Sequence, residues 1–545
     1  MSNALRAELA RVAEALGVAQ ASFVLERPRE PSHGDLATNL AMVLAKPLKS
    51  NPRALAERIV VQLDISSSLV AKTEIAGPGF INFWLSDEHL IETLRTIVER
   101  GPDYGRATAA QALTWNVEFV SANPTGPLHV GHGRGAATGD AIASLLEWSG
   151  HRVNREFYIN DAGSQIDKLA RSLWARVQQE VGRNATIPDG GYQGDYLRTT
   201  AAETLAQFGT AFADLSEEEG VARCRDIALA TQRAEQDRDL ADFGVHFDTI
   251  TSEQALYEEG QVDATLRLLD ANDLTYEADG ALWLKSSQYG DDQNRVLRKQ
   301  DGTLTYFVPD LAYHIQKHNR GFDRVIDVWG ADHHGYIPRM RAALRALGYP
   351  DRFFDVALVQ LVKIVRGGKE VKMSKRSGDF VTLADLVEEV GVDAARYFFL
   401  MRRGDSQLNF DLDLAKSQTE ENPIFYVQMA HARMSGIFRV AGIDPDSVTA
   451  DVQLQDFPSA HDMDLLKHLA IFPEVVARAA REREPHRIAA YLEDTARSTH
   501  AWYHHCRVLG EPAGVEHARL ALARAARITL ANGLNLLGLS APDRM

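Results

Sequence analysis

TWNVEFVSANPTGPLHVGHGRGAATGDAIASLLEWSGHRVNREFYIN, residues 114–160, is the stretch that decides the fold. Its first ten residues predict a strand, a glycine-rich turn leads into the predicted helix 139–150, and REFYIN at 155–160 predicts another strand. Strand, glycine turn and helix open a mononucleotide-binding βαβ unit. We therefore expect an α/β domain with a parallel sheet.

The sheet pattern is interrupted and then resumes further along the chain. Residues from about 165 to 245 are mostly polar and favour helix, which predicts an insertion. Strand patterns return at RVIDVWG (324–330) and DVALVQLVKIV (355–365). We place this interrupted α/β domain at residues 109–410.

A small α+β domain is expected before it, at residues 1–108. Apolar residues at helical spacing predict a first helix, and Asn51-Pro52 marks the start of a second. FINFWLS at 80–86 predicts a strand, and a third helix is expected at about 88–100. The apolar residues of the first helix are Leu5, Leu9, Val12 and Leu16.

An all-helical bundle is expected after it, at residues 411–545. Asn422 is a candidate cap and Pro423 a candidate first residue of a helix. The core positions of that helix are predicted to be Ile424, Val427, Met434 and Ile437.

Composition limits the kinds of function. The 545-residue chain has a net charge of -16, which argues against a protein that coats nucleic acid non-specifically but leaves a specific RNA partner open. Cys224 and Cys506 stand far apart, so neither a disulfide framework nor a thiolate zinc site is expected. No signal peptide or membrane span is evident, and we expect a cytoplasmic protein.

The glycine-rich turn holds a candidate phosphate site. His129 and His132 are three residues apart at the expected start of a helix, where backbone N–H groups and the helix dipole favour an anion. Gly131 between them would let a planar base approach. Two alternatives stay open: a helix start with satisfied histidines, and a metal site that lacks an evident third ligand.

A second motif lies in GGKEVKMSKRSGDFV, residues 367–381. Lys372 and Lys375 in a glycine-flanked loop could neutralise a departing pyrophosphate. By itself, such a run would more often be a solvated basic loop.

Together, HVGH and KMSK resemble the signatures of class I aminoacyl-tRNA synthetases. More specifically, residues 116–135, NPIFYVQMAHAR (422–433), YHHCRVLG (503–510) and the ending LSAPDRM look like the arginyl-tRNA synthetase family. The resemblance runs from SHGDLATNLA near residue 32 to Met545. It implies a Rossmann-like catalytic domain, an N-terminal additional domain that contacts the tRNA elbow, and a C-terminal anticodon-binding bundle.

The resemblance also implies the reaction. An arginine carboxylate attacks the α-phosphate of ATP, which is bound with Mg²⁺, and the arginyl group then passes to the 3′ end of tRNA(Arg). His129 and His132 would stabilise the α-phosphate, and Lys372 and Lys375 the pyrophosphate. Arg376 departs from the family pattern because a serine commonly ends the loop motif. The further ATP-binding residues implied are Gly131, Gly330, Asp332, Met373 and Ser374.

Arginine is a planar cation, so its site needs carboxylates that accept paired hydrogen bonds. Glu253 and Asp310 are the candidates, with Tyr306 one helical turn before Asp310. The resemblance places these three around the guanidinium group, and Ser121 and Asn123 at the α-amino end. Ordinary capping or surface acids are the alternative for both carboxylates.

WGADHHGY, residues 329–336, also permits a metal interpretation through Asp332, His333 and His334. Adjacent residues at a strand end point apart, so we favour the position beside the ATP ribose that the resemblance implies. No dedicated metal site is expected.

The helical bundle is expected to bind tRNA. Aromatic rings can stack on unpaired bases, although core packing is the alternative for each. Tyr426, Ala430 and Arg433 are predicted to share a helical face away from the apolar residues. The resemblance further implies that arginine activation requires bound tRNA, and we expect a monomer. The predicted tRNA contacts are Tyr426, Arg433, Trp502, Tyr503 and Met545.

Three competing functions share part of this pattern. A class I synthetase for another amino acid would share both signature motifs. A non-catalytic tRNA-binding paralogue would not need intact HVGH and KMSK sequences. A smaller nucleotidyltransferase could have the first motif alone, but it would not need the long helical segment.

Overall fold

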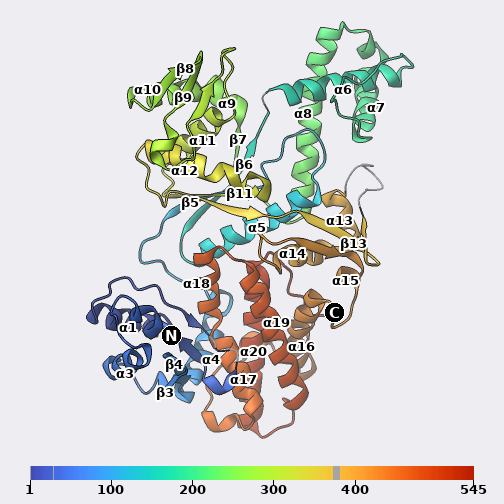
Figure 1. Cartoon of the computed structure of the whole chain (residues 1–545). Helices are drawn as coiled ribbons and strands as arrows, with labels where there is room; N and C mark the ends of the chain where they lie inside the picture. Colours follow the sequence, from blue (N-terminus) through green and yellow to red (C-terminus); the bar gives the residue numbers. More distant parts are fainter. Residues whose placement is uncertain (1, 27, 29, 162, 372–380) are drawn as a thin grey trace.

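A five-stranded parallel sheet forms the centre of the molecule (Figure 1). The computed structural model describes residues 1–545 except 1, 27, 29, 162 and 372–380. The sheet order is β12-β11-β5-β6-β7, and the predicted parallel sheet is confirmed. Its strands are β5 (Thr114–Glu118), β6 (Arg152–Ile159), β7 (Thr249–Ser252), β11 (Arg324–Gly330) and β12 (Phe354–Val359).

Helix α5 (Val130–Trp148) connects β5 to β6 and packs closely on the sheet. A Cβ atom on Gly139 would lie 2.2 Å from the Phe119 side chain, so only glycine allows this approach of helix to strand. The predicted order of strand, helix and strand in residues 114–160 is confirmed, but the helix begins at Val130 and not at 139, so the glycines 131, 133 and 135 lie in its first turns rather than in a turn before it.

The stretch 355–365 differs from its prediction as one continued strand pattern. It forms two strands, because the chain leaves the central sheet after β12 and enters a second sheet as β13 (Val362–Arg366). That sheet has the order β14-β13-β15, with β14 (Lys369–Val371) and β15 (Leu408–Asp411).

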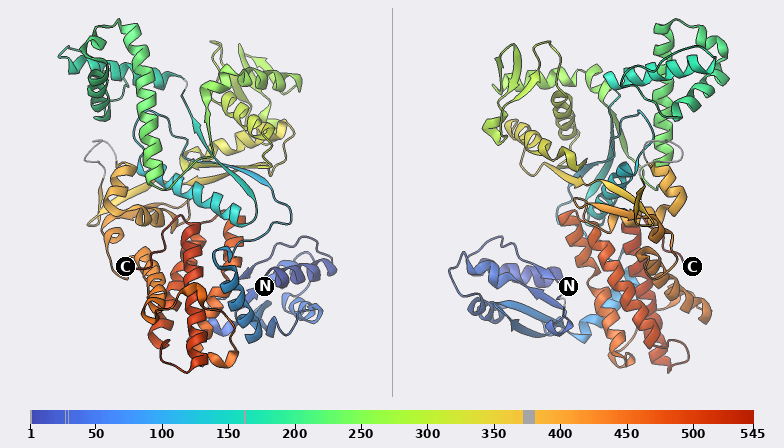
Figure 2. Two further views of the ribbon diagram at one scale, coloured as in Figure 1. Left: turned by 180° about the vertical axis from the view of Figure 1, so that it is seen from behind. Right: turned by 45° about the vertical axis from the view of Figure 1, so that its right-hand side comes forward.

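Two arms extend from one side of the central sheet (Figures 1 and 2). The first lies between β6 and β7 and is helical. The second lies between β7 and β11 and contains an antiparallel sheet, β10-β9-β8, that the sequence analysis did not anticipate. The first arm has α6 (Ser164–Glu180), α7 (Tyr196–Phe208) and α8 (Glu217–Asp242). The second has α9 (Glu253–Glu258), α10 (Gln261–Ala271), β8 (Thr275–Ala278), β9 (Ala281–Leu284), β10 (Arg295–Arg298) and α11 (Phe307–Asn319), and α12 (Ile337–Ala346) follows β11.

The N-terminal segment forms the predicted α+β unit. Its antiparallel sheet has the order β1-β2-β4-β3. Asn51 Oδ1 accepts the N–H groups of Arg53 and Ala54 at 2.9 and 3.2 Å, which confirms the predicted helix start. The elements are α1 (Ser2–Ala15), β1 (Leu25–Glu26), β2 (Leu36–Thr38), α2 (Leu40–Ala45), α3 (Pro52–Gln62), β3 (Val70–Ala76), β4 (Phe80–Leu85) and α4 (Asp87–Arg100).

The C-terminal segment is a helical bundle on the other side of the sheet (Figure 2). The predicted core residues of α16 are all buried. Asn422 precedes that helix as predicted, but its side chain does not cap it: Nδ2 donates to the carbonyl oxygens of Ala415 and Ser417. Its helices are α15 (Leu412–Lys416), α16 (Pro423–Ala441), α17 (Ala460–Ala470), α18 (Phe472–Glu482), α19 (His486–His505) and α20 (Ala513–Leu536). Before them, α13 (Leu383–Val390) and α14 (Val392–Leu400) pack on α5 of the central domain.

A buried arginine joins the bundle to the central domain. Arg396 is fully buried, and its guanidinium donates to the Asp140 carboxylate on α5 at 2.6 Å and to the Leu537 carbonyl after α20 at 3.1 Å. It also donates to the Phe243 carbonyl after α8 at 3.2 Å. Three segments far apart in the sequence therefore meet at one side chain.

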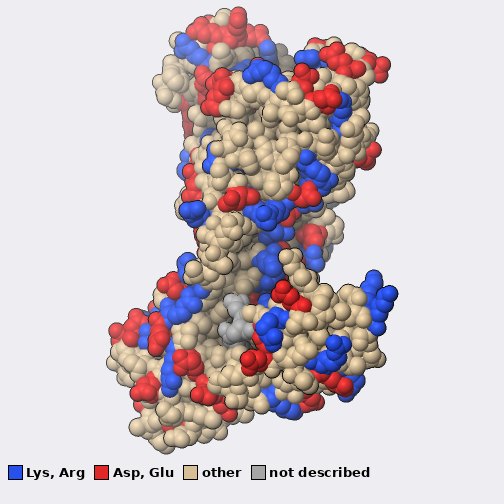
Figure 3. Space-filling model, turned by 90° about the vertical axis from the view of Figure 1, so that its left-hand side faces the viewer, with Lys and Arg blue, Asp and Glu red and all other residues tan. Residues whose placement is uncertain are grey.

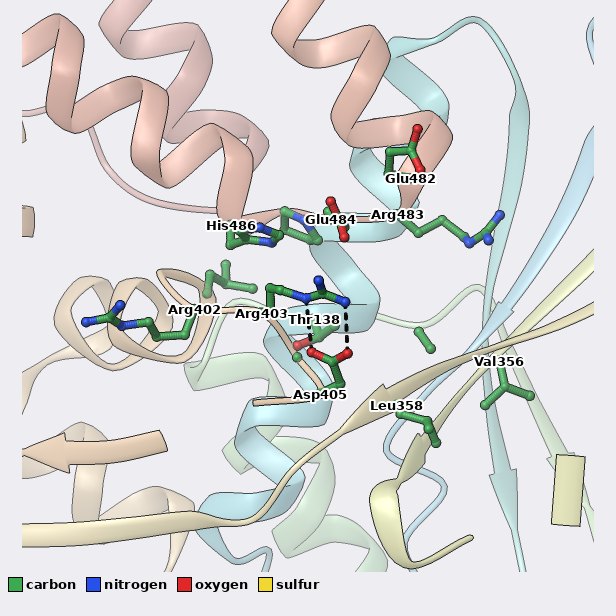
Figure 4. A pocket seen from close by; sticks show the side chains of 14 residues that line it. Thr138, Val356, Leu358, Arg402, Arg403, Asp405, Glu482, Arg483, Glu484 and His486 are labelled. Carbon is green, nitrogen blue, oxygen red and sulfur yellow. Dashed lines mark hydrogen bonds and ion pairs between the residues drawn. The ribbon is translucent and has the colours of Figure 1, made fainter. Parts of the chain in front are cut away.

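A cavity of about 250 Å³ lies between β12, α5 and the turn from α18 to α19 (Figure 4). Arg403 lines it and forms paired contacts with Asp405. The face in Figure 3 shows Lys and Arg side chains gathered around the narrow middle of the molecule. Within the described part of the chain, no helix has the length and apolar character needed to cross a bilayer.

Candidate active site

The carboxyl ends of the five parallel strands meet at one edge of the sheet, which is where α/β proteins bind ligands. Three predicted site residues directly follow these ends: Ser121 comes after β5, Glu253 after β7, and Gly330 ends β11. The strand order reverses between β5 and β11, which places the expected crevice beside Ser121.

The two histidines of the first motif cap α5 together. The Nδ1 atom of His129 accepts the backbone N–H of His132 at 3.2 Å, and Nδ1 of His132 accepts that of His129 at 3.3 Å. Their rings stack with centroids 3.6 Å apart. A Cβ atom on Gly131 would lie 2.8 Å from the His129 ring, so glycine is needed here for the ring itself.

This arrangement determines which ring nitrogen of each histidine carries the proton. Burial lowers the pKa of His129, and burial together with the neighbouring His129 lowers the pKa of His132 to about 3. Both rings are therefore neutral near pH 7. Because each Nδ1 accepts a hydrogen bond, the ring proton must be on Nε2.

The expectation that the backbone N–H groups of this turn point at a ligand is only partly met. The N–H of Val130 donates to the Val381 carbonyl, that of His132 to His129 Nδ1, and that of Gly133 to the His129 carbonyl. These internal bonds take up the backbone N–H groups of Val130, His132 and Gly133, so the motif would bind an anion mainly through its imidazole rings and the N–H of Gly131.

The chain that follows the second motif lies against the first. His129 forms an isolated antiparallel bridge with Thr382, and the Leu383 N–H donates to the Leu128 carbonyl at 2.7 Å. Lys372, Met373, Ser374 and Lys375 lie outside the described residues, as does Arg376. The exit of that loop is nevertheless fixed beside HVGH.

The turn after β5 has an unusual backbone. Val120 has φ +68° and Ser121 has φ +41°, a region that a β-branched residue rarely adopts. The Ser121 hydroxyl donates to Glu118 Oε1 at 2.8 Å and accepts the backbone N–H of Tyr158 at 3.2 Å. Such strain persists where the surroundings fix it, and it is common at functional sites.

The helical arm holds the segment that follows. Asn123 Nδ2 donates to Gln165 Oε1 at 2.7 Å. Gln236 on α8 donates to the carbonyls of Asn123 and Gly126, and the Tyr196 hydroxyl donates to the carbonyl of Thr125. These contacts could not be predicted from the sequence, because nothing in the polar insertion distinguishes Gln236 or Tyr196 from their neighbours.

Glu253 and Asp310 lie close to each other, since the charge of Asp310 acts on the Glu253 carboxyl group. Burial is the main cause that raises the pKa of Glu253 to about 7; the hydrogen bond from the Tyr158 hydroxyl opposes the rise, and the charge of Asp310 adds to it. Burial also raises the pKa of Asp310, against a hydrogen bond of 2.7 Å from the Tyr336 hydroxyl. Burial and then both carboxylates raise the pKa of Tyr257, which places the two acids near one ring.

Among the described residues, no lysine or arginine donates a hydrogen bond to either of these two carboxylates. The only hydrogen bonds that the described residues donate to them come from tyrosine hydroxyls, Tyr158 to Glu253 at 3.1 Å and Tyr336 to Asp310. Tyr306, one turn before Asp310, is 70% exposed at the start of α11. The site therefore favours an incoming cation. Sequence reasoning missed Tyr158 and Tyr336, which only the fold brings to these acids.

The segment after β11 forms a short 3-10 helix, Ala331–Tyr336. A Cβ atom on Gly330 would lie 2.4 Å from the Asp332 carboxylate, so the carboxylate folds back over the glycine. Asp332 and His333 are paired at 3.4 Å and are both mostly exposed.

The predicted tRNA contacts include both buried and exposed residues. Trp502 is fully buried, and its indole N–H donates to Asp462, so its ring offers no face to a base. Ala430 is also buried, so the predicted face of α16 is not wholly outside the core. Tyr503 is 45% exposed, Met545 is 56% exposed, and Arg433 lies over the Tyr503 ring at 5.8 Å. Tyr426 packs on the His500 ring, with centroids 4.4 Å apart.

Family models of known proteins match nearly the whole chain. Three family models match: the arginyl tRNA synthetase N-terminal domain at residues 1–85, the class I (R) tRNA synthetase catalytic domain at 94–434, and the DALR anticodon binding domain at 427–545.

Similar sequences and a similar solved structure are arginine–tRNA ligases, also called arginyl-tRNA synthetases. The arginine–tRNA ligase of Geobacillus kaustophilus is 47% identical over 547 residues, covering 99% of this chain and 98% of the relative. That of Shouchella clausii is 47% identical over 542 residues, covering 99% and 97%. The solved arginyl-tRNA synthetase of Thermus thermophilus aligns with a TM-score of 0.78 at 25% identity and covers 100% of both chains. The chain therefore belongs to the arginyl-tRNA synthetase family of class I aminoacyl-tRNA synthetases.

Proposed function

We propose that this chain attaches L-arginine to tRNA(Arg) in two steps, with the residues of the described site in the roles that follow. The arginine carboxylate attacks the α-phosphorus of ATP and pyrophosphate leaves. A terminal ribose hydroxyl of the tRNA then attacks the carbonyl of the adenylate, and AMP leaves. The observation that carries the proposal is the buried pair of carboxylates, Glu253 and Asp310, to which the described residues donate hydrogen bonds from tyrosine hydroxyls alone.

Glu253 and Asp310 bind the guanidinium group, with Tyr306 at its side. A planar cation can satisfy two carboxylates through several N–H donors at once, whereas an ammonium offers a point charge. Neutral analogues such as citrulline would leave both acids desolvated and unpaired, which gives strong discrimination without an editing site.

Ser121 and Asn123 bind the α-amino end of the substrate. Both follow β5, on the strained turn that the helical arm holds in place. Their position next to HVGH brings the α-carboxylate of arginine towards ATP. Positioning of this kind supplies much of the rate of a reaction between two bound substrates.

His129 and His132 donate Nε2–H groups to the α-phosphate, where negative charge develops during attack. Gly131 leaves space for the His129 ring, which a Cβ atom at this position would contact too closely. Lys372, Met373, Ser374 and Lys375 are proposed, from their motif alone, to bind the β- and γ-phosphates. Gly330 and Asp332 are proposed to lie beside the ATP ribose.

Mg²⁺ would accompany ATP in this scheme. Within the described ranges, no three His, Cys, Asp or Glu side chains gather into a metal site. In the proposed scheme, phosphate oxygens of ATP would supply ligands to Mg²⁺.

The three regions have separate roles in tRNA binding. We propose residues 1–108 as an elbow-binding domain, 109–410 as the catalytic domain with its helical insertion at about 165–245, and 411–545 as the anticodon-binding domain. The proposed tRNA contacts are Tyr426, Arg433, Tyr503 and Met545. Trp502 is buried and therefore cannot contact the tRNA. We propose a cytoplasmic monomer.

Charging of total tRNA with labelled arginine tests the proposal directly. We expect arginine to be attached, and neither lysine nor citrulline to be. Exchange of pyrophosphate into ATP is expected only when tRNA(Arg) is present with arginine. Charging with another amino acid would overturn the proposed specificity, and exchange without tRNA would overturn the tRNA requirement alone.

A further inference from the structure

A chain of buried charges lies behind the strained turn at Ser121. Lys317 on α11 is fully buried, and its Nζ donates to Glu118 Oε2 at 2.6 Å and to Asp327 Oδ1 at 3.0 Å. It also lies over the Tyr313 ring, 4.2 Å from the centroid. An ammonium group this deep in the protein requires charged partners on both sides.

Glu118 transmits this charge to the site. It is the last residue of β5, and its second oxygen, Oε1, accepts the Ser121 hydroxyl at 2.8 Å. One carboxylate therefore has Lys317 on one oxygen and Ser121 on the other. Burial raises the pKa of Glu118, and the ammonium of Lys317 at 2.6 Å opposes that rise. The direct ion pair favours the ionised carboxylate, which can only accept hydrogen bonds.

The hydrogen bonds of the Ser121 hydroxyl can then be counted. A hydroxyl has one proton to donate and two lone pairs that accept. Its proton goes to Glu118, and one lone pair accepts the Tyr158 N–H at 3.2 Å. One accepting position is left, so the hydroxyl can meet a donor but cannot itself donate to a ligand.

We propose that Glu118, paired with Lys317, is a positioning residue that fixes the Ser121 hydroxyl as an acceptor for the α-ammonium group of arginine. The inference rests on the proposed role of Ser121. In this proposal, Glu118 and Lys317 make the site prefer an α-ammonium group over an α-hydroxyl group, and they act only through Ser121.

The opposite end of the charge chain determines which variant is informative. Asp327 contacts His314 Nε2 at 2.9 Å, and His314 Nδ1 contacts the Asp310 carbonyl at 2.7 Å. Changing Lys317 would thus disturb both ends of the arginine site. Changing Glu118 disturbs the contact with Ser121 and leaves Lys317 its bond to Asp327.

Glu118→Gln is therefore the test variant. Its amide oxygen can accept from Lys317 while its amide nitrogen donates to the Ser121 hydroxyl, which frees the hydroxyl proton to turn towards a ligand. The probe is argininic acid, which has an α-hydroxyl in place of the α-amino group. Its inhibition constant is compared with the KM for arginine during charging of tRNA(Arg) by the full chain.

We expect Glu118→Gln to lower the preference for arginine over argininic acid by about tenfold, since a site built for one hydrogen-bond pattern loses its selectivity when that pattern is relaxed. The preference for arginine over citrulline, which reports the guanidinium end, is expected to stay unchanged. An equal loss at both ends would overturn the proposal and indicate a structural role.

Glu156→Gln is the matched control. Glu156 is a buried carboxylate directly beside Glu118 in the sheet, and it bonds to Asn116 and Arg320 but has no bond to Ser121 in the described structure. We expect this variant to keep the wild-type preference at the α-carbon. The same loss in both variants would also overturn the proposal.

A second variant covers the case in which Glu118→Gln does not fold. Ser121→Ala keeps the buried pair of Glu118 and Lys317 and removes only the hydroxyl. It is expected to lose the preference for arginine over argininic acid, and a retained preference would overturn the proposal. If the wild-type chain fails to charge tRNA with arginine at all, the proposed function fails instead.

Discussion

The side chains of His129 and His132 each accept the other residue's backbone N–H, so the two signature imidazoles are also the cap of the helix that they begin. The same two bonds fix the ring protons on Nε2. Helix capping and phosphate binding are thus combined in two side chains.

His132→Ala is expected to lower the rate of arginyl-adenylate formation by about 10²- to 10³-fold, because it removes one donor to the charge that develops on the α-phosphate. It also removes a cap, with a loss of about 1 kcal/mol in the free energy of unfolding. Pyrophosphate exchange with tRNA and thermal unfolding measure the two effects.

His132→Asn separates them. Its side-chain oxygen can still accept a backbone N–H, so we expect stability to recover while the exchange rate stays low. If the exchange rate recovers with the stability, His132 serves the helix and not the phosphate.

The KM for arginine is expected to rise as the pH falls below about 7. Burial raises the pKa of Glu253 to about 7, so the free site takes up a proton below that pH, and arginine binds the deprotonated form. One proton linked to binding changes KM by up to about tenfold per pH unit. Initial rates between pH 6 and 8 test this.

Glu253→Gln supplies the control for that pH profile. We expect its KM for arginine to be about 10²-fold higher, because a buried cation loses one partner, and to be nearly independent of pH over this range. A pH-dependent rise that persists in this variant would assign the proton to another group.

Tyr336→Phe is expected to raise the KM for arginine about tenfold. The Tyr336 hydroxyl donates to Asp310 at 2.7 Å and holds down the pKa of that acid, so its loss makes the ionised form less stable. The KM for ATP is the internal comparison and is expected to stay constant. An unchanged KM for arginine would mean that Asp310 does not bind the guanidinium group.

Two neighbouring aromatic residues should behave differently. Tyr503→Ala is expected to raise the KM for tRNA about tenfold with little change in stability, since a stacked base is worth about 1–3 kcal/mol. Trp502→Ala is expected to lower the free energy of unfolding by about 3–5 kcal/mol, because the indole is buried. Filter binding of tRNA and denaturant unfolding distinguish them, and a stable Trp502→Ala protein with weak tRNA binding would reverse the assignment.

Local sequence patterns were sufficient for the elements that position the site. Residue types were enough to predict the strand, helix and strand of 114–160 and the strand 324–330, but not that the helix begins at Val130, because three glycines at 131, 133 and 135 favour a turn on their own. The antiparallel sheet of the second arm was missed because β8, β9 and β10 have only four residues each, too few to show a period.

The partners of the site residues could not be predicted from spacing. Tyr158 reaches Glu253 from a strand 95 residues away, and Lys317 reaches Glu118 across 199 residues. Trp502 shows the opposite error: the aromatic type suggested stacking on RNA, whereas its contact with Asp462 shows that it serves the core. Such pairings depend on how elements pack, which residue type and period do not encode.

The guanidinium of Arg396 makes the carboxyl end of α20 and the signature helix α5 parts of one cooperative unit. Removing the bundle would keep the contacts of this cation with Asp140 and the Phe243 carbonyl, but would take away the Leu537 carbonyl and the packing that keeps the cation buried. We therefore expect the central domain and the C-terminal bundle to unfold together in a single transition rather than one after the other.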